Sequence, residues 1–213
     1  MSDTQNHFNQ AAADWDQRPF SVQMAEAATT AIRREIPLRN DMDALDFGCG
    51  TGLVSLSLAP ALRSVLGVDT AEEMLKTLAN KAQEQGFSQV STLRLDVTRE
   101  TLPLNRFDLV ISSMTFHHVA DTAALLQQLF ASLRPGGWIA VMDLDSEDGS
   151  FHAPTIPGVM HLGFARPALQ ALFEQAGFSA VRASTAHQVQ RKNAAGEPKE
   201  YTTFLMVAQK PTQ

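Results

Sequence analysis

The sequence predicts an α/β fold with a seven-stranded, mostly parallel sheet whose last strand is antiparallel, and with helices on both faces. Two observations lead to this prediction. From Asp43 onward, short β-branched or apolar runs alternate with longer stretches of helical period, which is typical of strand–helix units that feed a parallel sheet. The last two runs are joined instead by the polar segment Gln188 to Glu200, which has no helical period, so they should pair as an antiparallel hairpin.

Seven runs have the composition of strands: Ala44 to Phe47, Val65 to Val68, Thr92 to Leu95, Leu109 to Ser112, Trp138 to Met142, Ala180 to Ser184 and Thr203 to Ala208. Helices are expected at about Thr51 to Leu62, Ala71 to Gln85, Thr122 to Leu133 and Pro167 to Ala176. Gly86 and Gly177 stand where C-terminal caps belong, and Pro167 suits the first turn of its helix. The tetrapeptide Arg134-Pro135-Gly136-Gly137 cannot continue a helix and should form a turn that leads into a strand.

About forty residues precede the first predicted strand. Their apolar positions predict two short amphipathic helices: Ala12, Trp15, Val22, Met24, Ala27, Ala28, Ala31 and Ile32. The chain has 213 residues, of which 44% are hydrophobic, and this is enough to bury one core. We therefore expect a single domain over residues 1–213, with a helical lid at 1–40 and an α/β core at 41–213.

Composition also limits which classes of binding partner and which cellular locations are expected. The formal net charge is -6 and the basic pairs Arg33/Arg34 and Arg191/Lys192 are isolated, which argues against nucleic-acid binding. No apolar run reaches the roughly 18 to 20 residues of a membrane-spanning helix, and the polar start is unlike a signal peptide. The lone Cys49 excludes a disulfide framework and a cysteine zinc site. We expect a cytoplasmic protein with a small-molecule partner and no membrane contact, and the oligomeric state stays open.

The most informative segment is Leu45-Asp46-Phe47-Gly48-Cys49-Gly50-Thr51-Gly52, where an apolar strand runs into three alternating glycines and then a helix. Because glycine lacks a Cβ, it accepts unusual backbone angles and lets a ligand pack against the main chain near a helix N-terminus. A dinucleotide fingerprint needs its third glycine one position later, where this chain has Leu53. The spacing therefore disfavours NAD or FAD.

This segment resembles the first motif of the class I S-adenosylmethionine-dependent methyltransferases, in which an acidic residue precedes three alternating glycines. The resemblance covers nearly the whole chain. It includes Leu66-Gly67-Val68-Asp69, Leu95-Asp96-Val97, the strand from Phe107 to Ser113 and the turn from Leu133 to Gly137. It implies a Rossmann-like fold, S-adenosyl-L-methionine as cofactor and S-adenosyl-L-homocysteine as product.

The resemblance also implies roles for residues at the strand ends. Asp69 is similar to the family's carboxylate that accepts hydrogen bonds from both ribose hydroxyls, a role that suits an acceptor-only group. Asp96 is similar to the residue that accepts from the adenine amine. Because ligands of open α/β sheets bind outside the carboxyl ends of the strands, these motifs should converge. The predicted cofactor-binding residues are Asp46, Gly48, Cys49, Gly50, Gly52, Asp69, Thr70, Met74, Asp96, Val97, Ser112, Ser113 and Trp15.

Some of these residues have structural alternatives. Asp46 is interpreted either as a carboxylate that only binds loop amides or as one that also orients the methionine amino group. Cys49 is interpreted as a packing residue near the cofactor and not as a nucleophile. Trp15 and Phe20 are either lid core or ligand contacts, and the segment from Phe8 to Asp16 resembles the family's N-terminal cofactor cover.

Four histidines are candidates for catalysis. His117 and His118 follow the fourth strand, His152 follows the fifth, and His161 lies downstream. An imidazole can take a proton from a hydroxyl, thiol or amine at neutral pH, so one of them is a candidate general base, with His118 and His161 the first choices. The alternative for each is a structural hydrogen-bonding group. Quinone-pathway methyltransferases that use a metal carry acidic residues around the position of Met114 and His117, which this chain lacks. The sequence therefore predicts no metal, and a metal site formed by these histidines is the less favoured alternative.

The predicted function is methyl transfer from S-adenosylmethionine to an oxygen, sulfur or nitrogen atom of a small molecule. One alternative is a non-catalytic protein that binds S-adenosylmethionine. The other is a nicotinamide-dependent oxidoreductase, against which the glycine spacing already speaks.

Overall fold

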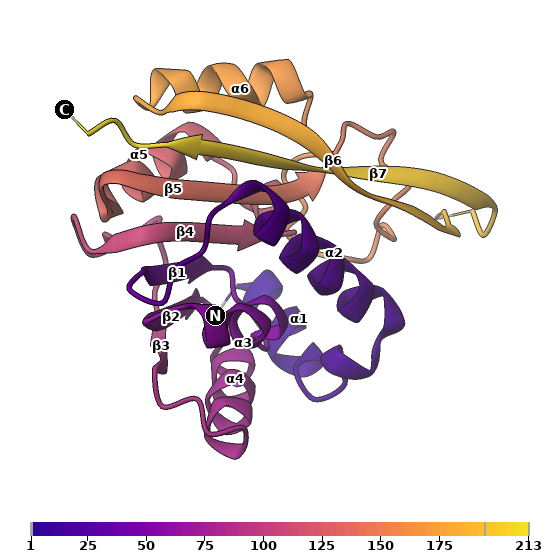
Figure 1. The fold of residues 1–213 in the computed structure, drawn as a ribbon. Helices are drawn as coiled ribbons and strands as arrows, with labels where there is room; N and C mark the ends of the chain where they lie inside the picture. Colours follow the sequence, from indigo (N-terminus) through magenta and orange to yellow (C-terminus); the bar gives the residue numbers. More distant parts are fainter. Residues whose placement is uncertain (1, 194, 213) are drawn as a thin grey trace.

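The computed structural model describes residues 2–193 and 195–212, and in it one sheet organises the chain (Figure 1). Its strands are β1 Asp43–Phe47, β2 Ser64–Asp69, β3 Val90–Arg94, β4 Phe107–Ser113, β5 Leu133–Leu144, β6 Ser179–Lys192 and β7 Pro198–Gln209. The α-helices are α1 Asp3–Ala11, α2 Pro19–Glu35, α3 Leu53–Leu58, α4 Glu72–Glu84, α5 Thr122–Ser132 and α6 Arg166–Gln175. Short 3₁₀ turns lie at η1 Trp15–Gln17, η2 Ala59–Ala61 and η3 Phe116–His118.

The strand order is β3-β2-β1-β4-β5-β7-β6. Parallel pairing joins β3 to β2, β2 to β1, β1 to β4 and β4 to β5. Only β7 runs the other way, because it pairs antiparallel with both β5 and β6. The predicted fold class is thus confirmed, and the order reverses between β1 and β4, which is where open α/β sheets bind ligands.

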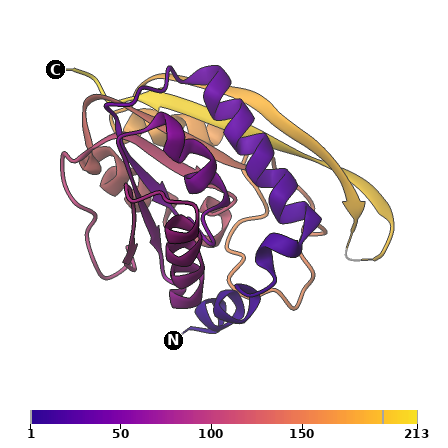
Figure 2. The same ribbon diagram turned by 60° about the horizontal axis from the view of Figure 1, so that its bottom comes forward.

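Helices cover both faces of the sheet, as Figures 1 and 2 show. Alternate strand residues face opposite ways: Ala44 packs in the core cluster that includes residues of α2 and α3, whereas Leu45 packs in the cluster that includes residues of α5 and α6. A smaller cluster joins α4 to the residue Cys49 in the glycine loop. Both faces of the parallel strands are therefore buried, as their continuous apolar runs require.

The N-terminal segment forms the two expected helices. Ser2 caps α1 through a capping box with Gln5, and Pro19 opens α2 at a position where its missing N–H costs nothing. In Figure 2, α1 lies beside α4 and α2 lies along the β6–β7 hairpin. Among the helices of the described residues, none combines the length and the apolar character that a membrane crossing requires.

Two predicted boundaries are wrong in an informative way. The helix expected at Thr51 to Leu62 is shorter, because Gly52 has a left-handed φ of 81° and Pro60, which has no N–H to donate, lies in the 3₁₀ turn that follows Leu58. The turn expected at Arg134 to Gly137 lies inside β5, where an irregular register separates the pairs that β5 forms with β4. Gly136 has φ 80° there, and its N–H donates to the carbonyl of Lys210 on the far side of β5.

The closing hairpin is longer than its composition suggests. Pairing between β6 and β7 continues to Lys192 and Pro198, so most of the polar segment Gln188 to Glu200 is strand. The hairpin reaches beyond the rest of the sheet in Figure 1. Much of β6 is exposed to solvent. Polar residues suit such a strand, and this is why the segment resembles a loop in sequence.

Candidate active site

The three glycines of the loop after β1 all have left-handed backbones, with φ of 70° at Gly48, 52° at Gly50 and 81° at Gly52. A Cβ on Gly48 would lie 2.2 Å from the Thr115 side chain, and one on Gly52 would lie 2.1 Å from Leu78, so these two glycines serve packing. A Cβ on Gly50 would have a single neighbour within 4 Å, at 4.0 Å. The main chain at Gly50 is therefore open to a ligand.

Asp46, near the end of β1, is almost fully buried with 2% exposure, and it accepts a 2.5 Å hydrogen bond from the Ser55 hydroxyl of α3. Burial raises the pKa of Asp46 to about 6 against the lowering effect of Ser55, and the charge of Asp69 raises it further. The carboxyl group thus holds the end of β1 to α3. Burial also raises the pKa of the Cys49 thiol well above its usual range, which agrees with a packing role.

The raised pKa of Asp46 predicts a pH-dependent stability. Between pH 4 and 6 the folded state holds a proton that the unfolded chain has released, so stability falls as pH rises through this window, by on the order of 3 kcal/mol. Asp46→Asn removes this loss and keeps the polar contact with Ser55. We therefore expect the free energy of unfolding, measured by urea titration of the ligand-free protein, to become increasingly larger for Asp46→Asn than for the wild type between pH 4 and 6. Above pH 6 the difference between the two proteins should stay constant.

The exposed carboxylate variant Glu84→Gln is the control for that series, and its margin should not follow the same curve. Parallel stability curves for Asp46→Asn and the wild type would show that Asp46 ionises normally.

Asp69, at the end of β2, reaches the glycine loop directly. Its two carboxylate oxygens accept the N–H of Gly50 and the N–H of Ala71, each at 2.9 Å. Burial raises the pKa of Asp69 against the lowering effect of these and other backbone N–H groups. Because each carboxylate oxygen can accept two hydrogen bonds, one acceptor position remains on each oxygen of this half-buried group. Two vicinal hydroxyl groups fit those positions.

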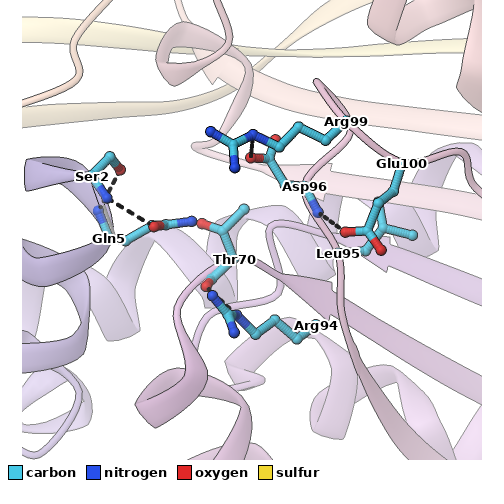
Figure 3. Close-up of a pocket in the computed structure, with 8 residues that line it drawn as sticks. All are labelled: Ser2, Gln5, Thr70, Arg94, Leu95, Asp96, Arg99 and Glu100. Atoms are coloured by element: carbon cyan, nitrogen blue, oxygen red, sulfur yellow. Dashed lines mark hydrogen bonds and ion pairs between the residues drawn. The ribbon is translucent and has the colours of Figure 1, made fainter.

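Asp96 follows β3, and the N–H of the preceding Leu95 donates to the Asp69 carbonyl at 3.2 Å, so the two strand ends lie together. The N–H and hydroxyl of Thr98 donate to one oxygen of Asp96 at 3.0 and 2.7 Å, and these bonds hold its pKa below the usual value against the effect of burial. A cavity of about 690 Å³ opens beside it (Figure 3). Its lining residues are Ser2, Gln5, Thr70, Arg94, Leu95, Asp96, Arg99 and Glu100.

The N-terminal helices close over this region. Phe8 of α1 meets Trp15 edge to face at 5.8 Å and meets His118 at 5.3 Å. Asp16 accepts a 2.5 Å hydrogen bond from the Thr51 hydroxyl in the glycine loop. The contributions of Ser2, Gln5 and Asp16 were not predicted, because short amphipathic helices carry no motif that would indicate which residues face a ligand.

The other predicted cofactor residues lie around the same strand ends. Thr70 lines the cavity, and Met74 is buried beneath the lid in a cluster with Ala71. The carbonyl of Val97 accepts a 2.8 Å hydrogen bond from a glutamine side chain of α5. The buried hydroxyl of Ser112 donates to a carbonyl at the end of β1 at 2.9 Å, and the carbonyl of Ser113 accepts from a threonine hydroxyl at 3.1 Å. The two serines thus hold the β1 and β4 ends in place.

Three of the four candidate histidines meet at the ends of β4 and β5. His117 is buried, and its Nδ1 donates to Asp143 of β5 at 2.7 Å. The Nε2 atoms of His117 and His152 are 3.2 Å apart. His118 bonds through Nδ1 to the carbonyl of Gly158 at 2.8 Å.

The electrostatics of this cluster follow from burial. Burial and the nearby charge of His117 lower the pKa of His118 to about 4 and that of His152 to about 3, so both rings are neutral at neutral pH. Burial alone would raise the pKa of Asp143, but the charge of His117 and the hydrogen bonds from it hold that pKa below its usual value. Asp143 is therefore an ionised group inside the core.

His161 lies apart from the other three. Its Nε2 is 2.9 Å from the Val119 carbonyl and 3.3 Å from the Thr122 hydroxyl. Asp143 was not among the predicted site residues, although a carboxylate at the end of an apolar strand is a signal that could have identified it.

Arg191 of β6 adds an unexpected cation near the cluster. Its guanidinium lies 4.8 Å from the ring centre of Phe20 and 4.5 Å from that of Phe151, and it lowers the pKa of His152. Burial lowers the pKa of Arg191 itself, and among the described residues no carboxylate forms an ion pair with it. A half-buried cation without an acidic partner suits an anionic ligand.

The known proteins that resemble this chain include several methyltransferases. A family model described as a methyltransferase domain matches residues 44–137. An uncharacterized methyltransferase of Schizosaccharomyces pombe is 29% identical over 155 residues, which are 66% of this chain and 55% of that protein. A ubiquinone biosynthesis O-methyltransferase of Leptothrix cholodnii is 30% identical over 123 residues, which are 56% of this chain and 52% of that protein. The chain thus spans about half the length of these curated relatives.

A solved structure of phosphoethanolamine N-methyltransferase 2 from Haemonchus contortus, in complex with S-adenosyl-L-methionine, has the same fold, with a TM-score of 0.70 at 16% identity over 96% of this chain and 60% of that one. The family match spans β1, the glycine loop, β2, β3 and β4, and it ends in β5. The matched stretch includes Asp46, Asp69 and Asp96. Residues 44–137 thus match the methyltransferase domain family, and the whole chain has the fold of a solved S-adenosylmethionine-bound methyltransferase.

Proposed function

We propose that this protein transfers a methyl group from S-adenosylmethionine to a small molecule that binds beside the histidine cluster. The observation that carries the proposal is the meeting of the Gly50 main chain with Asp69, next to a cavity that Asp96 lines. The cofactor supplies an electrophilic methyl group on a sulfonium. The chain's own residues would bind it, orient it and exclude water, with residues 1–40 as the cover.

The residues present fit this cofactor. The open side of Gly50 lets an adenosyl group approach the backbone, and the two remaining acceptor positions of Asp69 suit the ribose hydroxyls. Positioning supplies most of the acceleration in such a transfer, since well-oriented reactants gain on the order of 7–11 kcal/mol at best.

The acceptor is proposed to be a small anionic metabolite. Among the relatives, a ubiquinone biosynthesis O-methyltransferase and a trans-aconitate 2-methyltransferase have names that specify small-molecule acceptors, which supports a small-molecule acceptor without indicating which atom of it is methylated. Arg191, held between Phe20 and Phe151 near His152, is placed to attract a carboxylate or phosphate on that molecule. The acceptor atom itself is proposed to contact the free Nε2 of His118, because Nδ1 of that ring is committed to Gly158.

His118→Ala tests this placement. We expect the affinity for S-adenosylhomocysteine to stay within about twofold, whereas kcat falls by roughly 100-fold or more, the usual contribution of a positioned proton acceptor. Calorimetry measures the first quantity and product formation the second. If His161→Ala lowers kcat as much as His118→Ala does, the acceptor lies outside the cluster.

The decisive experiment has two parts. Calorimetric titration with S-adenosylhomocysteine, with NADH as the comparison, tests the binding function. A panel of anionic and neutral oxygen, sulfur and nitrogen acceptors, with detection of methylated product, tests the transfer. Binding without turnover on any acceptor would favour the non-catalytic alternative, and preference for NADH would contradict the proposal altogether.

A further inference from the structure

The histidine cluster brings three potential metal ligands close together. His117, His118 and His152 each offer one ring nitrogen, and these three atoms lie within 4.8 Å of one another. Two nitrogens that bind one tetrahedral zinc ion at 2.0–2.1 Å lie about 3.3 Å apart. The Nε2 atoms of His117 and His152 are already 3.2 Å apart.

The groups behind the rings orient them for this purpose. Asp143 accepts a hydrogen bond from Nδ1 of His117, and the Gly158 carbonyl accepts one from Nδ1 of His118, so the Nε2 of each ring is the nitrogen left for a ligand. Metal-binding histidines are typically oriented by a carboxylate or a backbone carbonyl in this way. If the cluster served only to join His117 to His152 by a hydrogen bond, it would not require His118 or the Gly158 carbonyl that orients His118.

The three imidazole nitrogens also indicate which metal ions would bind. Imidazole nitrogen suits zinc, copper, nickel and iron, whereas magnesium and calcium prefer oxygen ligands. Three protein ligands with one open position are the arrangement of catalytic zinc sites. Acidic residues near Met114 are therefore unnecessary for such a site, because imidazoles can take their place as ligands.

We propose that His117, His118 and His152 bind a divalent transition-metal ion such as zinc. With the ion bound to Nε2 of His118, the open position on the ion would hold the acceptor's oxygen or sulfur atom in place of a direct contact with that nitrogen, and this role rests on the methyl transfer proposed above. The acceptor's O–H or S–H proton passes to water as the atom binds the ion. A lone pair of that atom then forms the bond to the methyl carbon, and the electrons of the broken carbon–sulfur bond stay on the departing sulfur.

The test uses the full chain without a histidine tag, treated with a chelator and then titrated with zinc chloride in a calorimeter. We expect one ion per chain with a Kd below about 1 µM, and the visible absorption of four-coordinate Co²⁺ when cobalt replaces zinc. His152→Ala and His118→Ala should each weaken zinc binding by more than 100-fold, since loss of an orienting partner alone costs 10–100-fold. His161→Ala is the matched control and should keep wild-type affinity.

These substitutions leave the buried His117 and Asp143 pair intact, so the variants should fold, and circular dichroism checks this. S-adenosylhomocysteine affinity is measured on the same samples. Absence of saturable zinc binding, or equal weakening by His161→Ala, would overturn the metal site. If S-adenosylhomocysteine still binds in that case, the proposed methyl transfer stands without the metal, whereas failure of that binding would remove the function itself.

Discussion

Asp69→Ala is expected to weaken S-adenosylhomocysteine binding by roughly 100-fold. The variant loses two charge-assisted hydrogen bonds to the ribose, each worth about 1.5 kcal/mol, which together make about 3 kcal/mol. It also frees the N–H groups of Gly50 and Ala71, so the loop loses its preformed shape. Calorimetric titration measures the change directly.

Glu84→Ala is the matched control, since it removes an exposed carboxylate at the far end of α4 and should leave the affinity unchanged. The midpoint of thermal unfolding without ligand separates lost binding from lost folding. Unchanged affinity in a folded Asp69→Ala protein would refute the ribose assignment.

Asp143→Ala is expected to destabilise the protein by about 2–4 kcal/mol, because it leaves buried hydrogen-bond donors without an acceptor, at a cost of about 1–3 kcal/mol for each donor. His117 is 1% exposed and Asp143 is 0% exposed, so water cannot replace the lost contact. Asp143 also accepts the N–H of Leu144 at 2.7 Å, which the variant leaves without a partner. Urea unfolding at pH 7 measures the loss.

Asp143→Asn should recover part of this stability, because an amide oxygen can still accept from the His117 ring. Asp148→Ala is the surface control: Asp148 is ion-paired with Lys199 but exposed, so its removal should change stability far less. An Asp143→Ala protein that unfolds at the wild-type urea concentration would show that the pair contributes little.

The order of elements and the strand-end motifs could be predicted because they depend on local properties. Alternation of buried residues along β1 and the glycines after it are set by strand periodicity and by backbone sterics. The errors occurred where contacts between distant residues decide the outcome. Gly136 lies inside a strand because its N–H meets Lys210, some seventy residues away, and polar residues form the long hairpin because each pairs with a partner strand. The single-domain organisation and the cytoplasmic location stay predictions.

For the site, residue types at strand ends determined the cofactor half, since the carboxyl ends of parallel strands share one edge wherever their loops go. Only the tertiary structure decided which histidines meet. The positions of His152 and His161 depend on the path of residues 145–165. This path is set by the hydrogen bond from the Ser146 N–H to the Phe164 carbonyl and by the salt bridge between Asp145 and Arg166. That path brings His152 to His117 and turns His161 toward Val119. Contacts between the two ends of the loop fix this path, and the periodicity of the loop sequence does not indicate them.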